Sequence, residues 1–134
     1  MIVNAIYRPP YNRSIYFSDL CEEVENTNKK HPNSVCWTVG DLNLPDVDWK
    51  NLDIIGNRYL KDINERALLF VNNSFQEQQV EDPTRLDNIL DIFLTNRHSS
   101  TLKCSLIPGL SDHDIVSVKA TLSAMFLKKP RRSI

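Results

Sequence analysis

The chain has 134 residues, of which 41% are hydrophobic and 25% are charged, and its formal net charge is −1. This length corresponds to one domain with a substantial core. A nearly neutral charge gives no overall electrostatic attraction to nucleic acid or to a membrane surface. No apolar run approaches the ~18 residues of a transmembrane helix, and the first residues do not resemble a secretion signal. We therefore expect an intracellular protein that does not interact with membranes.

In chain order, the sequence predicts alternating strands and helices. Apolar residues spaced by three and four positions predict helices at residues 14–30 and 61–73. Short apolar runs predict strands at residues 1–6, 35–39, 76–80, 88–95, 102–107 and 114–122. Residues 44–56 are expected to form a long loop. The pattern as a whole predicts an α/β fold, a sheet with helical crossovers.

The most informative stretch, Gly40 to Asp46, follows the second predicted strand. Gly40 is expected to turn the chain out of the sheet. Asp41 and Asn43 lie two residues apart, so in extended geometry both side chains would point to one side. A carboxylate and an amide at a strand end can bind a hard cation or orient a water against a phosphate. The alternative is that both are ordinary turn residues.

Other polar residues also fall at or near the ends of predicted strands. Asp91 sits inside an apolar predicted strand, where an unpaired carboxylate would be costly, so it should be paired, bind a metal or lie at a sheet end. Asp112 and His113 lie on a loop, where a histidine oriented by a carboxylate can act as a base or contact a phosphate. The alternatives are a capping role for Asp112, a solvent-exposed His113 and simple packing for Tyr7. A doubly wound sheet would bring these ends together.

Four motifs occur in order along nearly the whole chain: residues 6–10 (IYRPP), 40–49 (GDLNLPDVDW), 83–85 with 88–91 (PTR and NILD), and 111–114 (SDHD). Together they resemble the endonuclease/exonuclease/phosphatase superfamily, in particular the apurinic-endonuclease-like endonuclease domains of non-LTR retrotransposons. The resemblance implies that residues 1–124 form the second half of a four-layer α/β/β/α sandwich. Residues 125–134 would then be a basic tail or linker.

The resemblance implies catalytic roles for five residues. Tyr7 would contact the scissile phosphate. Asp41 would position or deprotonate the attacking water, and Asn43 would hold that water or the phosphate. Asp91 would pair with His113, which would stabilise the charge that develops at the phosphate or act as an acid or base.

The resemblance also implies a metal cofactor and a DNA substrate. Asp41 and Asp112 would hold Mg²⁺ or Mn²⁺, which neutralises charge on the non-bridging phosphate oxygens. Arg8, Asn43 and Arg85 would contact the DNA.

One departure from the family pattern concerns the principal metal ligand. In the family, a glutamate in the first half of the domain holds the metal, and that half precedes the tyrosine motif with which this chain begins. We therefore expect a weakly held metal and weak or no hydrolysis by this chain alone. A single remaining sheet would expose an apolar face, which predicts self-association or a partner polypeptide that supplies the missing half.

The sequence thus predicts a retrotransposon-derived, divalent-metal-dependent DNA endonuclease that acts in the nucleus and is impaired by truncation. One alternative is a phosphatase of the same superfamily. Another is a non-catalytic remnant that binds nucleic acid or a protein partner. The basic run Lys128–Arg132 fits a phosphate-contacting arm, a nuclear address, a linker or a solvated chain end.

Overall fold

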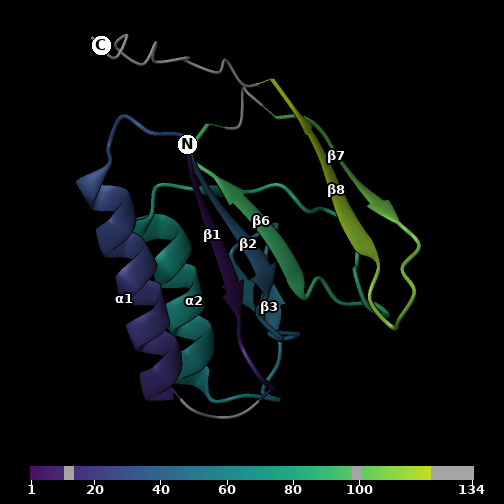
Figure 1. Ribbon diagram of the computed structural model, residues 1–134. Helices are drawn as coiled ribbons and strands as arrows, with labels where there is room; N and C mark the ends of the chain where they lie inside the picture. The colour runs from purple at the N-terminus through teal and green to yellow at the C-terminus, as the bar shows by residue number, and fades with distance from the viewer. Residues whose placement is uncertain (11–13, 98–100, 122–134) are drawn as a thin grey trace, which may run out of the picture.

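The computed structural model describes residues 1–10, 14–97 and 101–121 (Figure 1). The predicted basic tail, residues 125–134, lies outside the described residues, as does the predicted domain boundary at residue 124. Among the described residues, no helix combines the length and the apolar character that a membrane span requires.

A mixed four-stranded sheet forms the centre of the molecule. Its strand order is β1 (Ile2–Tyr7), β2 (Cys36–Asp41), β6 (Asp91–Thr95) and β5 (Glu77–Gln78). β1 and β2 are parallel, whereas β6 is antiparallel to both of its neighbours. The parallel pair needs a crossover connection, which helix α1 (Ser14–Lys30) supplies.

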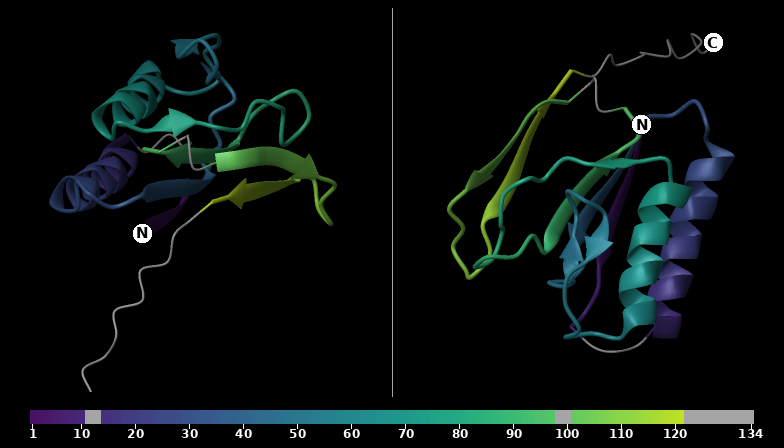
Figure 2. Two further views of the ribbon diagram at one scale, coloured as in Figure 1. Left: turned by 90° about the horizontal axis from the view of Figure 1, so that it is seen from above. Right: turned by 180° about the vertical axis from the view of Figure 1, so that it is seen from behind.

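Two helices cover one face of this sheet. α1 and α2 (Lys61–Asn73) lie side by side there (Figures 1 and 2). Phe17 of α1 and Phe70 of α2 are 0% and 1% exposed, and they pack with Ile6, Leu42, Ile92 and Leu94 from the sheet and the chain that follows β2. Arg66 also donates a hydrogen bond of 2.7 Å to Glu25 and so links the helices.

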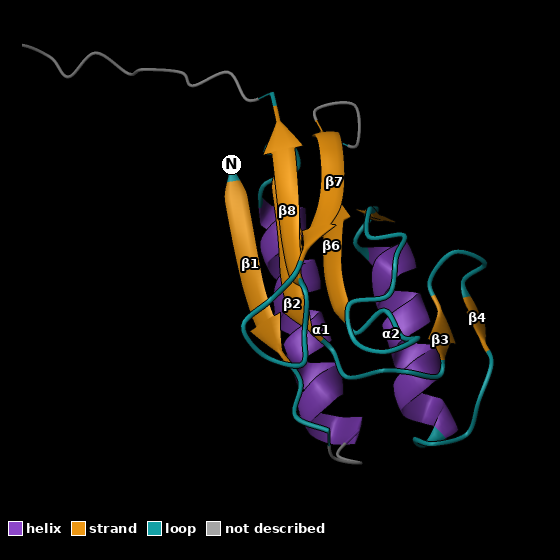
Figure 3. Cartoon of the chain, turned by 90° about the vertical axis from the view of Figure 1, so that its right-hand side faces the viewer, coloured by secondary structure: helices purple, strands orange, loops and turns teal. Residues whose placement is uncertain are grey.

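A two-stranded hairpin covers part of the opposite face. β7 (Thr101–Ile107) and β8 (Ile115–Ala120) pair with each other and cross in front of the sheet, with β1 to one side (Figure 3). A groove of about 530 Å³ remains between the sheet and β8, and Val3, Trp37, Val39, Phe93, Val116 and Val118 are among its lining residues. Val3 is 51% exposed, so the hairpin leaves part of this apolar face open.

The described residues therefore form three layers: helices, sheet and hairpin. This α/β arrangement agrees with the predicted fold class, and the four-layer sandwich stays a prediction. Both helices lie on one face and most strand pairs of this sheet are antiparallel, so it is not the doubly wound sheet that would bring the strand ends together. The strand ends converge for a different reason: β6 runs opposite to β1 and β2, so its beginning lies beside their ends.

Both predicted helices are confirmed. Most differences between the predicted and the observed elements concern the strands. β2 does not leave the sheet at Gly40 but continues to Asp41. Gly40 has a φ of 145°, and a Cβ atom there would collide with the carbonyl oxygen of Ile6, so glycine is required by the close approach of β1. The predicted loop at residues 44–56 contains a small hairpin of β3 (Val47–Asp48) and β4 (Asp53–Ile54).

Candidate active site

The ends of three strands place three polar residues in one row. Tyr7 lies opposite Asp41 in the parallel β1–β2 pair, and Asp41 lies opposite Asp91 in the antiparallel β2–β6 pair. Directly opposed residues have their side chains on the same face of a sheet, so these three share a face. It is the face that the hairpin partly covers, because Asp91 lines the groove beneath β8.

The loop between β7 and β8 brings a histidine to this row. Nδ1 of His113 lies 2.7 Å from Oδ2 of Asp91, and Nε2 lies 3.9 Å from Oδ2 of Asp41. The side chains of His113, Asp41 and Asp91 are 23%, 21% and 23% exposed. We refer to these three residues as the acid–histidine cluster. The predicted pairing of Asp91 with His113 is thus present in the structure.

The electrostatics of the cluster favour proton transfer. The hydrogen bond with Asp91 raises the pKa of His113 above its usual value, and the charges of Asp91 and Asp41 act in the same direction. Burial raises the pKa of Asp41, although the hydrogen bond from the Asn43 backbone opposes this effect. Because Nδ1 of His113 faces the carboxylate of Asp91, Nε2 is the ring nitrogen that can exchange a proton near Asp41.

The cluster also has the composition of a cation site. One ligand atom from each of its three residues lies within 4.8 Å of the others. Carboxylate oxygens are the protein ligands that Mg²⁺ and Mn²⁺ prefer. The arrangement can therefore combine acid–base chemistry with binding of a divalent cation.

A set of interlocking hydrogen bonds fixes the direction of Asp41. The backbone N–H of Arg8 donates to the carbonyl of Asp41 at 2.9 Å. The guanidinium of Arg8 donates to the carbonyls of Leu42 and Asn43, each at 3.2 Å. In return, the side-chain amide of Asn43 donates to the carbonyl of Arg8 at 2.8 Å, and its backbone N–H donates to the Asp41 carboxylate at 2.9 Å. These bonds tie the end of β1 to the end of β2.

This arrangement corrects two sequence-based expectations. Arg8 is 1% exposed, and its guanidinium lies 5.7 Å from the Phe17 ring centroid and 4.8 Å from that of Tyr59, so it does not fit the predicted DNA contact. Asn43 is not extended after Asp41: it has a φ of 48° and is 8% exposed. The expectation that both side chains point to one side is therefore wrong, and the predicted contact of Asn43 with phosphate or water stays a prediction.

The remaining predicted residues lie around the cluster. Tyr7 is 58% exposed at the end of the row. Asp112 does not join the cluster but pairs with Arg85 at 2.9 Å, with side chains 63% and 42% exposed. The structure thus does not place Asp112 among the possible metal ligands. Arg85 remains at the surface near His113, and its DNA contact stays a prediction.

Sequence reasoning missed Thr84. This residue is 1% exposed, and its hydroxyl accepts hydrogen bonds from the backbone N–H groups of Leu90 and Asp91 at 3.1 and 3.2 Å. The available signal was its place between Pro83 and Arg85 in one of the four motifs.

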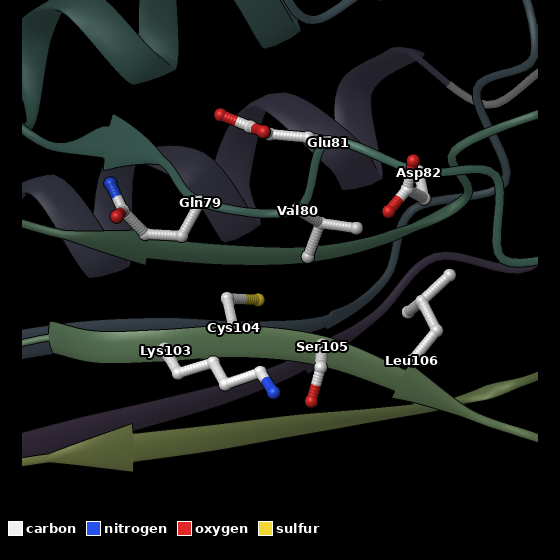
Figure 4. Close-up of a pocket in the computed structure, with 8 residues that line it drawn as sticks. All are labelled: Gln79, Val80, Glu81, Asp82, Lys103, Cys104, Ser105 and Leu106. Atoms are coloured by element: carbon white, nitrogen blue, oxygen red, sulfur yellow. The ribbon is translucent and has the colours of Figure 1, made fainter.

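A separate cavity lies between residues 79–82 and β7 (Figure 4). Its volume is about 230 Å³, and its lining includes Glu81, Asp82 and Cys104. Burial raises the pKa of Cys104, which keeps its thiol protonated and weakly nucleophilic. No residue of the acid–histidine cluster lines this cavity, so the two sites are distinct.

Comparison with known families agrees with this geometry. The sequence profile of the endonuclease-reverse transcriptase family matches residues 1–117, a range that contains Tyr7 and the whole acid–histidine cluster. Among curated proteins, no match to the chain was found. Because the match covers most of the chain, this protein belongs to the endonuclease-reverse transcriptase family, within the endonuclease/exonuclease/phosphatase superfamily.

Proposed function

We propose that this chain hydrolyses phosphodiester bonds in DNA with the help of Mg²⁺ or Mn²⁺, and that it acts in the nucleus. The observation that supports this proposal most directly is the acid–histidine cluster beside Tyr7, in a chain whose family is that of retrotransposon nucleases. A phosphatase of the same superfamily would use similar groups, and the family match favours a nucleic-acid substrate.

Each residue of the row has a distinct chemical task in this proposal. Asp41, with its raised pKa and fixed carboxylate, orients the attacking water and accepts its proton. His113, held by Asp91, faces the phosphate with Nε2 and stabilises negative charge there in its protonated form. The exposed hydroxyl of Tyr7 donates a hydrogen bond to a phosphate oxygen.

The donor set fits a divalent cation that is held weakly. Asp41 and Asp91 would hold it, and the bound ion would supply neutralisation of charge on the phosphate oxygens. Mg²⁺ normally uses one or two carboxylates and keeps several waters, so two carboxylates form a sufficient but modest site. We expect low affinity, and low activity for the chain alone.

Nicking of supercoiled plasmid DNA by the purified chain with Mg²⁺ or Mn²⁺ tests this proposal. Wild type should nick, and nicking should be lost with a chelator and in His113→Ala and Asp41→Asn. His31→Ala and Asp19→Asn are matched controls because both residues are exposed and lie outside the cluster. Equal nicking by all variants would indicate a contaminating nuclease. A folded wild type that does not nick would refute hydrolysis by this chain and favour a non-catalytic DNA-binding role.

A second proposal concerns association through the partly open sheet face. Val3 and Ile115 are each 51% exposed, and both line the groove between the sheet and β8. Apolar surface of this kind favours contact with another copy of the chain or with a partner polypeptide. A monodisperse monomer in size-exclusion chromatography with light scattering would contradict self-association.

A further inference from the structure

Thr84 connects the beginning of β6, where Asp91 lies, with the chain just before β8, directly after His113. Its hydroxyl accepts hydrogen bonds from the backbone N–H groups of Leu90 and Asp91, at the point where β6 begins. Its carbonyl accepts a hydrogen bond of 2.8 Å from the backbone N–H of Asp114, the residue between His113 and β8. One buried residue thus contacts the chain at Asp91 and directly after His113.

The loop that contains Thr84 is itself well defined. Thr84 and Arg85 both donate backbone hydrogen bonds to the carbonyl of Asn88, at 2.9 and 3.1 Å, and Asn88 donates back to Arg85 at 3.0 Å. The pair of Arg85 and Asp112, at 2.9 Å, adds a second link from this loop to the loop of His113. These bonds fix the position of Thr84 relative to the starts of β6 and β8.

Asp91 and His113 are 22 residues apart, and the chain between them contains all of β7. Among the described residues, the hairpin of β7 and β8 forms no strand pair with the central sheet, so sheet pairing does not fix the distance between His113 and Asp91. Another interaction must therefore keep Asp91 and His113 at their 2.7 Å contact. The hydroxyl and the carbonyl of Thr84 supply it, because one binds the chain at Asp91 and the other binds it at Asp114. Both lone pairs of the hydroxyl are used by the two N–H donors, which fixes its direction as well.

We propose that Thr84 is a positioning residue that sets the Asp91–His113 pair by holding the start of β6 with its hydroxyl and the start of β8 with its carbonyl. The consequence for catalysis rests on the phosphodiester hydrolysis proposed above. The geometric claim does not depend on it, because the pair can be observed directly. The hydrogen bonds of Thr84 described above are with backbone groups, so it acts through the residues that it holds in place.

Thr38 offers a matched comparison. It is also a buried threonine, 0% exposed, and lies in β2 of the same sheet. Its hydroxyl bonds to the Gln76 side chain at 2.9 Å, away from the cluster. Replacing either threonine by valine keeps the shape and removes a buried hydrogen-bonding group, so both variants lose stability. Only the Thr84 variant should alter the histidine.

The experiment is NMR of the ¹⁵N-labelled chain, with the side-chain Nδ1 proton of His113 as the readout. Wild type should show a downfield Nδ1 proton because it is hydrogen-bonded to Asp91. Thr84→Val should lose this signal to exchange with water, whereas Thr84→Ser, which keeps the hydroxyl, and Thr38→Val should retain it. A folded Thr84→Val with an unchanged Nδ1 signal would overturn the proposal.

A measurement on wild type covers the case in which Thr84→Val does not fold. Hydrogen exchange should find the backbone amide of Asp114 protected, although this residue is exposed, because it donates to Thr84. An Asp114 amide that exchanges as fast as an unbonded one would refute the link.

In a nicking assay, Thr84→Val should lose about 10²-fold in nicking rate, while Thr84→Ser retains most of the activity. If wild type does not nick, hydrolysis fails as a function and the NMR result still decides the role of Thr84.

Discussion

The two faces of the central sheet differ sharply in how they are covered. On the helix face, Ile92 and Leu94 are 2% and 0% exposed. On the hairpin face, Phe93 beneath the hairpin is also buried, but Val3 and Tyr7 of the edge strand β1 are 51% and 58% exposed. The helix face therefore supplies most of the apolar burial that stabilises the chain. The hairpin face carries the polar row and an apolar surface that is only partly covered. We infer that stability and function are separated onto opposite faces.

Removal of His113 should separate activity from stability most strongly. His113→Ala should lower nicking by about 10²- to 10⁴-fold, the usual contribution of an acid–base group. The free energy of unfolding by urea, measured at a pH above the raised pKa of His113, should change little because the imidazole is outside the helix-side core. The control is His31→Ala, at an exposed position away from the cluster. A large loss of stability in His113→Ala would show that the hairpin face also holds the fold together.

The reverse test is a truncation on the helix face. Phe70→Ala should destabilise the chain by about 3–5 kcal/mol, because Phe70 is 1% exposed and its loss leaves a cavity between α2 and the sheet. The protein that remains folded should keep its activity per molecule. Urea unfolding followed by circular dichroism measures the change. A stability change below about 1 kcal/mol would contradict the assignment of the core to this face.

The pH dependence of stability reports on the Asp91–His113 pair. The pKa of His113 is raised in the folded state, so its contribution to stability is fully present below its unfolded pKa of about 6.5 and is lost as pH rises through the higher folded value. Unfolding free energies of wild type should therefore fall over this range. Asp91→Asn, which removes the main cause of the shift, should flatten the curve. An identical curve for both proteins would show that the pair does not form in solution.

The smallest effect on stability is expected for Val3→Lys. Val3 is half exposed, so the free energy of unfolding should change by less than about 1 kcal/mol. Its effect should appear in association: a charge on the open sheet face should lower the mass measured by light scattering at high concentration. Leu69→Lys is the matched control, since Leu69 is 50% exposed on α2. Equal effects of both changes would mean that the sheet face has no special role.

Local sequence patterns were sufficient for part of this structure. Both helices followed from apolar spacing, because each buries one stripe on the sheet. The pairing of Asp91 with His113 followed from the motif resemblance and is present in the structure. Each of these features could be predicted from a short sequence pattern or motif.

Other features depend on long-range packing and could not be predicted in this way. Arg8 is buried because Phe17 and Tyr59, from distant parts of the chain, lie close to its guanidinium. Asn43 turns to the Arg8 carbonyl instead of remaining extended. Gly40 stays in the strand because β1 approaches it closely. In each case, a contact with a distant segment overrides the local expectation.

A Mn²⁺ titration of the ¹⁵N-labelled chain tests whether the acid–histidine cluster binds the divalent cation. Paramagnetic broadening falls steeply with distance, so it locates the bound ion. If the acid–histidine cluster is the metal-dependent site, the amide signals of Asp41, Asp91 and His113 should broaden first, and Asp41→Asn should abolish the effect. Broadening that begins instead at Glu81 and Asp82, in the cavity of Figure 4, would contradict the claim.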